Sequence, residues 1–130
     1  MKGFHTNIEQ AARENTYFRR VLYTTSNLQL VVMSLNPSED IGEEMHHLDQ
    51  FIRVETGEGK AVLDGEETIL QDGSVIIIPS GTTHNIINTS SEAPMKLYTV
   101  YAPANHKDGV IHKTKEEAVA DEEHFDGEVS

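Results

Sequence analysis

The stretch GSVIIIPSGTTHNIIN, residues 73–88, decides the fold of this chain. Its consecutive apolar residues Val75–Ile78 are typical of a buried strand, and Pro79–Gly81 ends that strand in a turn. His84 then opens a second strand on the same face as Ile86, because successive side chains of a strand point to opposite faces. The stretch therefore predicts two short strands around a tight turn, with one imidazole directed inward.

The chain on both sides of this stretch repeats the pattern of short strands and turns. The runs are rich in Val, Ile, Leu, Thr and Tyr, and turn-forming residues separate them. No helical period lies between the runs, so an all-β sandwich or barrel is favoured over an α/β sheet. The runs are YFRRVLYTT (17–25), LQLVVMSL (28–35), QFIRVETG (50–57), GKAVLDG (59–65), SVIIIP (74–79), HNIIN (84–88) and KLYTVYAP (96–103).

Three parts are expected along the chain: an N-terminal segment (1–16), a barrel (17–103) and a C-terminal part (104–130). Residues 7–15 are typical of a short helix, with Asn7 as its N-cap. The C-terminal part is expected to contain a loop, a short helix and an acidic tail. We expect the tail to fray, because it has many acids and little apolar surface to bury.

The composition excludes several classes of protein. The 130 residues include no cysteine, which excludes a disulfide scaffold, a thiolate metal site and a cysteine nucleophile. The 10 basic and 22 acidic residues give a net charge of −12, which repels phosphate backbones and anionic lipid. We therefore expect neither nucleic acid nor a membrane as a partner. The first residues have no apolar signal region, and a cytoplasmic location is expected.

Two apolar runs indicate that part of the sheet is covered on both faces. A strand with one solvent-exposed face should alternate apolar and polar residues. In contrast, Leu30–Met33 and Val75–Ile78 are apolar at successive positions. Either the N-terminal segment or a second subunit would supply the extra cover. We expect a homodimer.

A second stretch, EEMHHLDQF at residues 43–51, places polar groups in the predicted barrel interior. Glu44 and His46 are two residues apart and share one face of the chain, whereas His47 lies on the other. Gln50 begins the next strand in phase with its apolar residues, so it is directed inward. A register in which His47 is the inward residue is the alternative.

Four polar groups from separate segments are thus expected to meet in one apolar interior: Glu44, His46, Gln50 and His84. Buried polar groups need a partner, and one divalent ion satisfies all four. The alternative is a metal-free barrel in which these groups bond to one another and to water.

The stretch at residues 73–88 resembles the second motif of the cupin family, G(X)5PXG(X)2H(X)3N. The resemblance covers about residues 18–101 and implies the double-stranded β-helix, or jelly-roll barrel, of a small single-domain cupin. Every fixed position of this motif is present, as Gly73, Pro79, Gly81, His84 and Asn88.

The first cupin motif, G(X)5HXH(X)3–4E(X)6G, is matched in spacing but altered in its residues. Ser38 stands in place of the first Gly, Glu44 in place of the first His, and Gln50 in place of the Glu. His46 and Gly57 agree with the motif. Similar small microbial cupins often carry only general descriptions, so the resemblance does not define an activity.

The ligand set implied by the resemblance differs from the three imidazoles and one carboxylate that are usual in cupins. Two imidazoles (His46, His84), one carboxylate (Glu44) and one amide oxygen (Gln50) keep the formal charge of the set at −1. An amide oxygen is a weak donor, so Gln50 either binds the ion or supports a ligand. Two His and one carboxylate also form a facial triad that suits Fe(II). One divalent transition metal is expected, and Fe, Mn, Ni, Co, Cu and Zn all accept such ligands.

The expected function is that of a metal-dependent enzyme acting on a small polar substrate, such as a sugar or a keto acid. An isomerase would combine a Lewis-acid metal with a base, and a dioxygenase would use a redox metal. No residue is identified as the base. A barrel that binds metal or a small ligand without turnover is the second hypothesis, and a purely structural dimer is the third.

Four further histidines lie outside the two motifs. His5, His106, His112 and His124 fall in predicted loops or termini, where side chains are usually solvated. None of them is expected to take part in the site.

Overall fold

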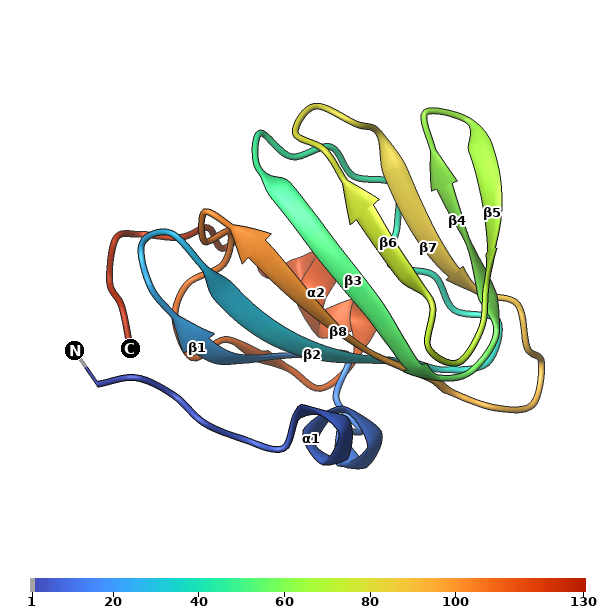
Figure 1. Ribbon diagram of the computed structural model, residues 1–130, viewed down its shortest axis with the longest axis horizontal. Helices are drawn as coiled ribbons and strands as arrows, with labels where there is room; N and C mark the ends of the chain where they lie inside the picture. The colour runs from blue at the N-terminus through green and yellow to red at the C-terminus, as the bar shows by residue number, and fades with distance from the viewer. Residues whose placement is uncertain (1) are drawn as a thin grey trace.

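The computed structural model describes residues 2–130 (Figure 1). Most of its regular structure is β-strand. Neither helix in the described part of the chain is long and apolar enough to span a membrane. The helices are α1 (Ile8–Glu14) and α2 (Lys115–Ala120), and the strands are β1 (Arg19–Thr24), β2 (Gln29–Leu35), β3 (Asp49–Thr56), β4 (Gly59–Leu63), β5 (Glu66–Leu70), β6 (Val75–Ile78), β7 (His84–Asn88), β8 (Met95–Ala102) and β9 (Ile111–His112).

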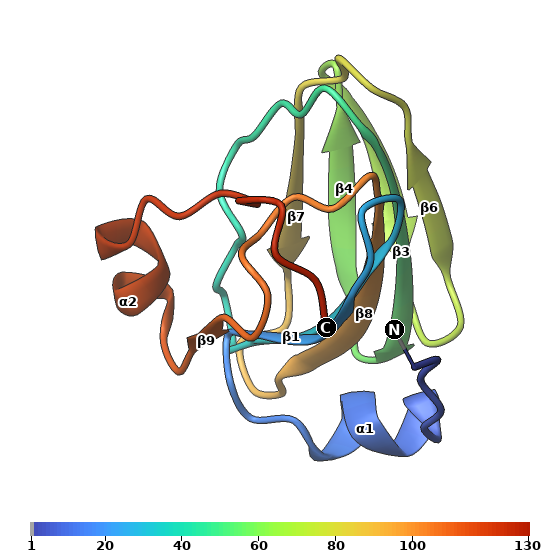
Figure 2. The same ribbon diagram turned by 90° about the vertical axis from the view of Figure 1, so that its left-hand side faces the viewer.

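Two antiparallel sheets face each other and confirm the predicted jelly-roll barrel (Figures 1 and 2). The larger sheet has the strand order β6-β3-β8-β2-β1-β9, and the smaller has the order β5-β4-β7. Strand β8 lies at the centre of the larger sheet, paired with β2 on one side and β3 on the other. The chain passes repeatedly from one sheet to the other, which is how a jelly roll closes around its core.

The inner faces of the two sheets share one apolar core. Along β8 the buried residues Met95, Leu97, Thr99 and Tyr101 alternate with more exposed ones, as a strand with one buried face requires. Burying one large aliphatic side chain contributes about 1.5–3 kcal/mol to the free energy of unfolding. The largest fully buried apolar side chains are Met33, Leu35, Ile52, Leu70, Ile78, Ile86, Met95 and Leu97.

Helix α1 confirms the predicted N-terminal helix. The Asn7 side chain accepts a hydrogen bond of 3.0 Å from the backbone N–H of Gln10, which satisfies a free donor at the helix start. Ala12 is completely buried, and α1 packs against the outer face of the larger sheet (Figure 1).

The apolar run of β6 is buried on only one face. Ile78 is 2% exposed and faces the core, whereas Val75 and Ile77 are 48% and 55% exposed. The N-terminal segment therefore does not supply the second cover that was expected for this strand.

The segment 36–48 connects β2 to β3 and runs beside β7 (Figure 2). It is bridged to β7 at two points, Asp40 with Ile87 and Glu44 with His84. At the second bridge, the backbone N–H of each residue donates to the carbonyl of the other at 2.8 Å. The two stretches singled out in the sequence are therefore held side by side.

Asn88, the last fixed position of the second motif, anchors the loops at the far end of β7. Its side chain is almost fully buried, and its Nδ2 donates to the carbonyls of Leu35 at 3.2 Å, Asn36 at 3.1 Å and Ala93 at 2.9 Å. Its Oδ1 accepts a hydrogen bond of 3.0 Å from the backbone N–H of Ser90. One amide thus ties the end of β2 to the loop before β8.

The acidic tail folds back against the barrel, so the expectation that it frays is wrong. The Glu123 side chain is only 8% exposed, because it is bonded to His106. Further along, the backbone N–H of Phe125 donates to the Asn105 carbonyl at 3.0 Å. Pairing with a buried imidazole orders this segment, and composition alone does not reveal such a pair.

Replacing Asn88 with alanine should lower the free energy of unfolding by about 3 kcal/mol, because it leaves buried carbonyls without donors. Urea denaturation of the purified protein measures this change. The matched control is Asn27→Ala in an exposed turn, which should stay within about 0.5 kcal/mol of the native protein. Equal unfolding midpoints for both variants would contradict the role given to Asn88.

Candidate metal centre

His84 begins β7 with its side chain inside the barrel, and the residue is 5% exposed. Its Nδ1 lies 2.9 Å from the carbonyl oxygen of Thr82. A carbonyl can only accept, so Nδ1 carries the proton and donates it. In a neutral imidazole the Nε2 atom then has a free lone pair. This is the orientation usual for a metal-binding histidine that is held by a backbone carbonyl.

Glu44 and His46 project from the segment 36–48 into a shared space. Glu44 Oε2 and His46 Nε2 are 3.2 Å apart, yet Nε2 has no well-aligned hydrogen bond to any described residue and is shielded from solvent. Two ligand atoms that bind one ion at about 2.1 Å lie about 3 Å from each other, so the spacing suits a shared cation. His47 is exposed, and the alternative register is not the one observed.

Gln50 lies on β3 and is directed inward, as predicted, with 5% of its surface exposed. Its Nε2 donates a hydrogen bond of 3.0 Å to the Thr99 hydroxyl. Its Oε1 is buried and has no partner among residues 2–130. Leaving a buried carbonyl unpaired costs about 1–3 kcal/mol, so this oxygen fits a cation or a water molecule as its missing partner.

The structure brings Glu44, His46 and His84 together and links Gln50 to them through Tyr101. The His46 and His84 rings have centroids 5.4 Å apart. Tyr101 is the cross-strand neighbour of Gln50, and its ring meets His46 edge-on with centroids 6.0 Å apart. Within residues 2–130, no three His, Asp or Glu side chains are already gathered as a metal-binding group. The bridge between the backbones of Glu44 and His84 holds these two residues side by side.

The surroundings of Glu44 favour its ionised form. Burial by itself raises the pKa of the Glu44 carboxyl, but the close contact with His46 and the charges of His46, Arg19 and His84 outweigh burial. The pKa is therefore held below its ordinary value of 4.5. At neutral pH Glu44 is a carboxylate, which is the form that binds a metal ion.

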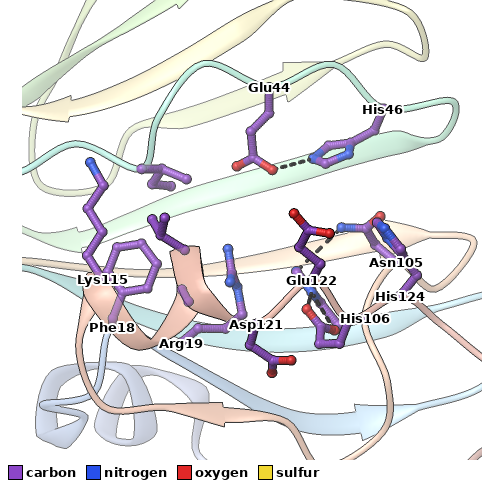
Figure 3. A pocket seen from close by; sticks show the side chains of 14 residues that line it. Phe18, Arg19, Glu44, His46, Asn105, His106, Lys115, Asp121, Glu122 and His124 are labelled. Atoms are coloured by element: carbon purple, nitrogen blue, oxygen red, sulfur yellow. Dashed lines mark hydrogen bonds and ion pairs between the residues drawn. The ribbon is translucent and has the colours of Figure 1, made fainter.

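A cavity of about 290 Å³ opens beside Glu44 and His46 (Figure 3). The segment 36–48 forms one wall, and the opposite wall comes from β1 and the C-terminal part of the chain. Figure 3 shows Arg19 and His106 on that opposite wall, across the cavity from Glu44 and His46. A ligand held in this cavity lies between the two walls.

His106 is buried in the second wall, so the expectation that it is solvated is wrong. Its Nδ1 lies 3.0 Å from both carboxylate oxygens of Glu123, and its Nε2 lies 3.4 Å from the Tyr101 hydroxyl. Burial lowers the pKa of His106, although Glu123 opposes the shift. The ring is therefore neutral at pH 7, with a lone pair on Nε2. His5 and His124 are exposed, as predicted.

Arg19 on β1 is a cavity residue to which the sequence analysis assigned no role. Its Nη1 donates a hydrogen bond of 3.2 Å to Nδ1 of His112, whose Nε2 donates to Asp121 at 2.9 Å. His112 is 3% exposed, so its predicted solvation is also wrong. A signal for Arg19 was present, because it is in phase with the core residue Val21. The sequence spacing of His106 and His112 did not indicate their contacts with Glu123 and Asp121.

Replacing Glu123 with glutamine should lower the free energy of unfolding by about 1 kcal/mol at pH 7, because His106 loses a charged acceptor. Burial opposes ionisation of Glu123, but the bond to His106 outweighs it and holds the pKa below the ordinary 4.5. The stabilisation is therefore complete above pH 4.5 and is lost as the pH falls through the lowered value.

Urea denaturation between pH 7 and pH 3 measures this dependence. The difference between the native protein and Glu123→Gln should disappear at the acid end. Glu128→Gln, an exposed acid of the same tail, is the control and should match the native protein throughout. A constant difference at every pH would contradict the ionised pair.

Comparison with known proteins agrees with this fold. The family model for the cupin domain matches residues 31–101. The uncharacterized protein YrkC of Bacillus subtilis (strain 168) is 43% identical over 129 residues, which span 94% of this chain and 69% of YrkC. The uncharacterized protein L612 of Acanthamoeba polyphaga mimivirus is 44% identical over 109 residues, which span 81% of this chain and 68% of L612.

A solved structure is also similar over nearly the whole chain. The crystal structure of BH2720 from Bacillus halodurans aligns with a TM-score of 0.90 and 42% identity, covering 92% of this chain and 96% of that one. A family match over more than half of the residues, together with these relatives, establishes that the chain belongs to the cupin family.

Proposed function

We propose that this cupin binds one divalent transition metal through Glu44, His46, Gln50 and His84 and is an enzyme acting on a small polar molecule. The observation that carries the proposal is a pair of buried side-chain atoms without a well-aligned hydrogen bond, His46 Nε2 and Gln50 Oε1. Both belong to the four residues that the motifs single out. Buried polar atoms in native proteins are almost always paired, and a cation pairs both at once.

Each of these residues has a distinct part in holding the ion. His84 offers Nε2 because its Nδ1–H is bonded to Thr82. Glu44 supplies the negative charge. Gln50 offers Oε1 because its Nε2 is bonded to Thr99, which prevents the amide from turning over. When bound, the metal supplies Lewis acidity or redox chemistry to the cavity.

His106 supports an acid–base step beside the metal centre. The ring is neutral at pH 7, and its Nε2 lies 3.4 Å from the Tyr101 hydroxyl. His106 lines the cavity, so its neutral ring can take up a proton released there, and Glu123 stabilises the imidazolium that results. This pair favours an isomerase over a dioxygenase. Turnover without oxygen would support the isomerase, whereas turnover that needs Fe(II) and oxygen would support the dioxygenase.

The metal site is tested by elemental analysis of protein made without a histidine tag. After removal of metal with EDTA, the protein is incubated with Mn, Fe(II), Co, Ni, Cu or Zn ions and freed of unbound ions by gel filtration. We expect about one ion per chain for at least one of these metals, and less than a tenth of that in His46→Ala and His84→Ala.

The matched control is His47→Ala, because His47 is the exposed neighbour of His46. It should bind as much metal as the native protein. Native protein that binds none of the six metals would contradict the proposal and favour the metal-free barrel. Metal binding that survives in His84→Ala would place the ion elsewhere.

We also propose a homodimer formed through the outer face of β6. Val75 and Ile77 are about half exposed there, and the edge strand β6 is free on one side. Phe51 of β3 is the cross-strand neighbour of Ile77, and its ring packs on Tyr98 with centroids 6.2 Å apart. Ile77, Phe51 and Tyr98 thus lie next to one another on this face, and adjoining exposed apolar side chains are typical of a contact between subunits.

Replacing Ile77 with glutamate should convert the dimer to a monomer, because two carboxylates would be buried at the contact. Light scattering coupled to gel filtration measures the mass. Ile111→Glu is the control, since Ile111 is similarly exposed but lies on β9 at the opposite edge of the sheet. A native protein with the mass of one chain at 100 μM would contradict the dimer.

A further inference from the structure

We propose that Arg19 binds a carboxylate group of the ligand in the cavity, so that the substrate is a small carboxylic acid. This inference rests on the proposed function, because it concerns the ligand of the same cavity. It depends on the state of the Arg19 guanidinium, on the donors it leaves free, and on the charges around it.

Arg19 is a buried cation that lacks a carboxylate partner. Only 7% of the residue is exposed, and no ion pair within residues 2–130 includes it. The guanidinium lies over the Phe18 ring, 5.3 Å from its centroid, and its Nη1 is bonded to His112. Buried charges in proteins are paired or bind a counter-ion, so Arg19 needs an anion.

The free donors of Arg19 suit a carboxylate. Nη1 is already bonded to His112, whereas Nε is buried and has no partner among the described residues. The Nε and Nη2 hydrogens point from the same edge of the planar group. Two parallel N–H donors on one edge match the two oxygens of a carboxylate. Phe18 and His112 hold the plane in place, so little side-chain freedom is lost on binding.

The charges that line the cavity disfavour a ligand with more than one negative charge. Four acids line it, Glu44, Asp121, Glu122 and Glu123, and its lysine, Lys115, is paired with Asp40. The Arg19 guanidinium balances one carboxylate, whereas a phosphate dianion would place a second negative charge among these acids. A carboxylic acid is therefore favoured over a phosphate ester.

The position of Arg19 across the cavity from Glu44 and His46 gives the acid an orientation (Figure 3). A carboxylate held by Arg19 directs the adjacent carbon of the acid toward these two residues. An α-hydroxyl or keto oxygen on that carbon then faces the candidate metal centre. The ligand class is thus a 2-hydroxy or 2-keto acid small enough for a cavity of about 290 Å³.

The test uses metal-free protein in 0.15 M NaCl, with lactate, pyruvate, malate and inorganic phosphate as probes and lactamide as the uncharged match of lactate. Binding is followed by NMR through the Arg19 Nε–H signal, which is assigned by its absence in Arg19→Lys. At least one of the three acids should shift this signal saturably in the millimolar range, while lactamide and phosphate should not.

The variants separate a bound carboxylate from a general effect of charge. Arg19→Met lacks the reporter signal, so its affinity and that of the native protein are compared through the shifts of backbone amide signals. This variant should weaken binding of the acid about tenfold or more, because a charge-assisted pair of hydrogen bonds is lost. Arg20→Met is the matched control, since Arg20 is the exposed neighbour on the same strand, and it should bind as the native protein does. If Arg19→Met does not fold, Arg19→Gln takes its place in the same comparison.

The result is independent of the metal, because metal-free protein is used. If the native protein binds no metal, the proposed function is overturned, but the measurement at Arg19 still tests the present inference. Three results would overturn the present inference while the metal centre stands. They are no shift of the Nε–H signal with any of the three acids at 20 mM, equal binding of lactate and lactamide, and equal affinity in Arg19→Met and the native protein.

Discussion

The two backbone hydrogen bonds between Glu44 and His84 are the constraint on which the site depends. They are formed where the segment 36–48, which has little regular structure, passes β7. Together with the bridge between Asp40 and Ile87, they hold the loop that carries Glu44 and His46 against the sheet. Residues from the two motifs therefore lie side by side.

The polar atoms that lack partners show how the stability of the barrel and its chemistry are balanced. The buried, unpaired side-chain atoms among residues 2–130 are Arg19 Nε, His46 Nε2, Gln50 Oε1 and Arg53 Nε. All but the last belong to the cavity or to the candidate ligand set. Each lowers the stability of the empty barrel, and the apolar core between the sheets compensates for that loss. Binding of a metal ion or a polar ligand to these atoms would recover this energy.

The barrel could be predicted from the sequence because its signals are local. Turn residues separate the strands, and the alternation along β8 or the apolar run of β6 follows directly from the backbone period. The same period placed Gln50 and His84 inside. The bonds of His106 and His112 to acids of the tail could not be predicted in this way. These contacts form only by tertiary folding, and the spacing of the residues in the sequence does not indicate them. Arg19 could have been identified as a candidate from the sequence, because a charged residue on the same strand face as the core residue Val21 is unusual.

The residues of the cavity and the candidate ligand set lie partly inside and partly outside the range that the family model matches. The match to the cupin family model covers residues 31–101 and includes Glu44, His46, Gln50 and His84. Phe18 and Arg19 precede this range, and His106 and Glu123 follow it. The candidate metal ligands and the groups that would select an organic ligand thus belong to different stretches of the gene. Changes in the flanking stretches would therefore alter the lining of the cavity without changing the four residues proposed to hold the ion.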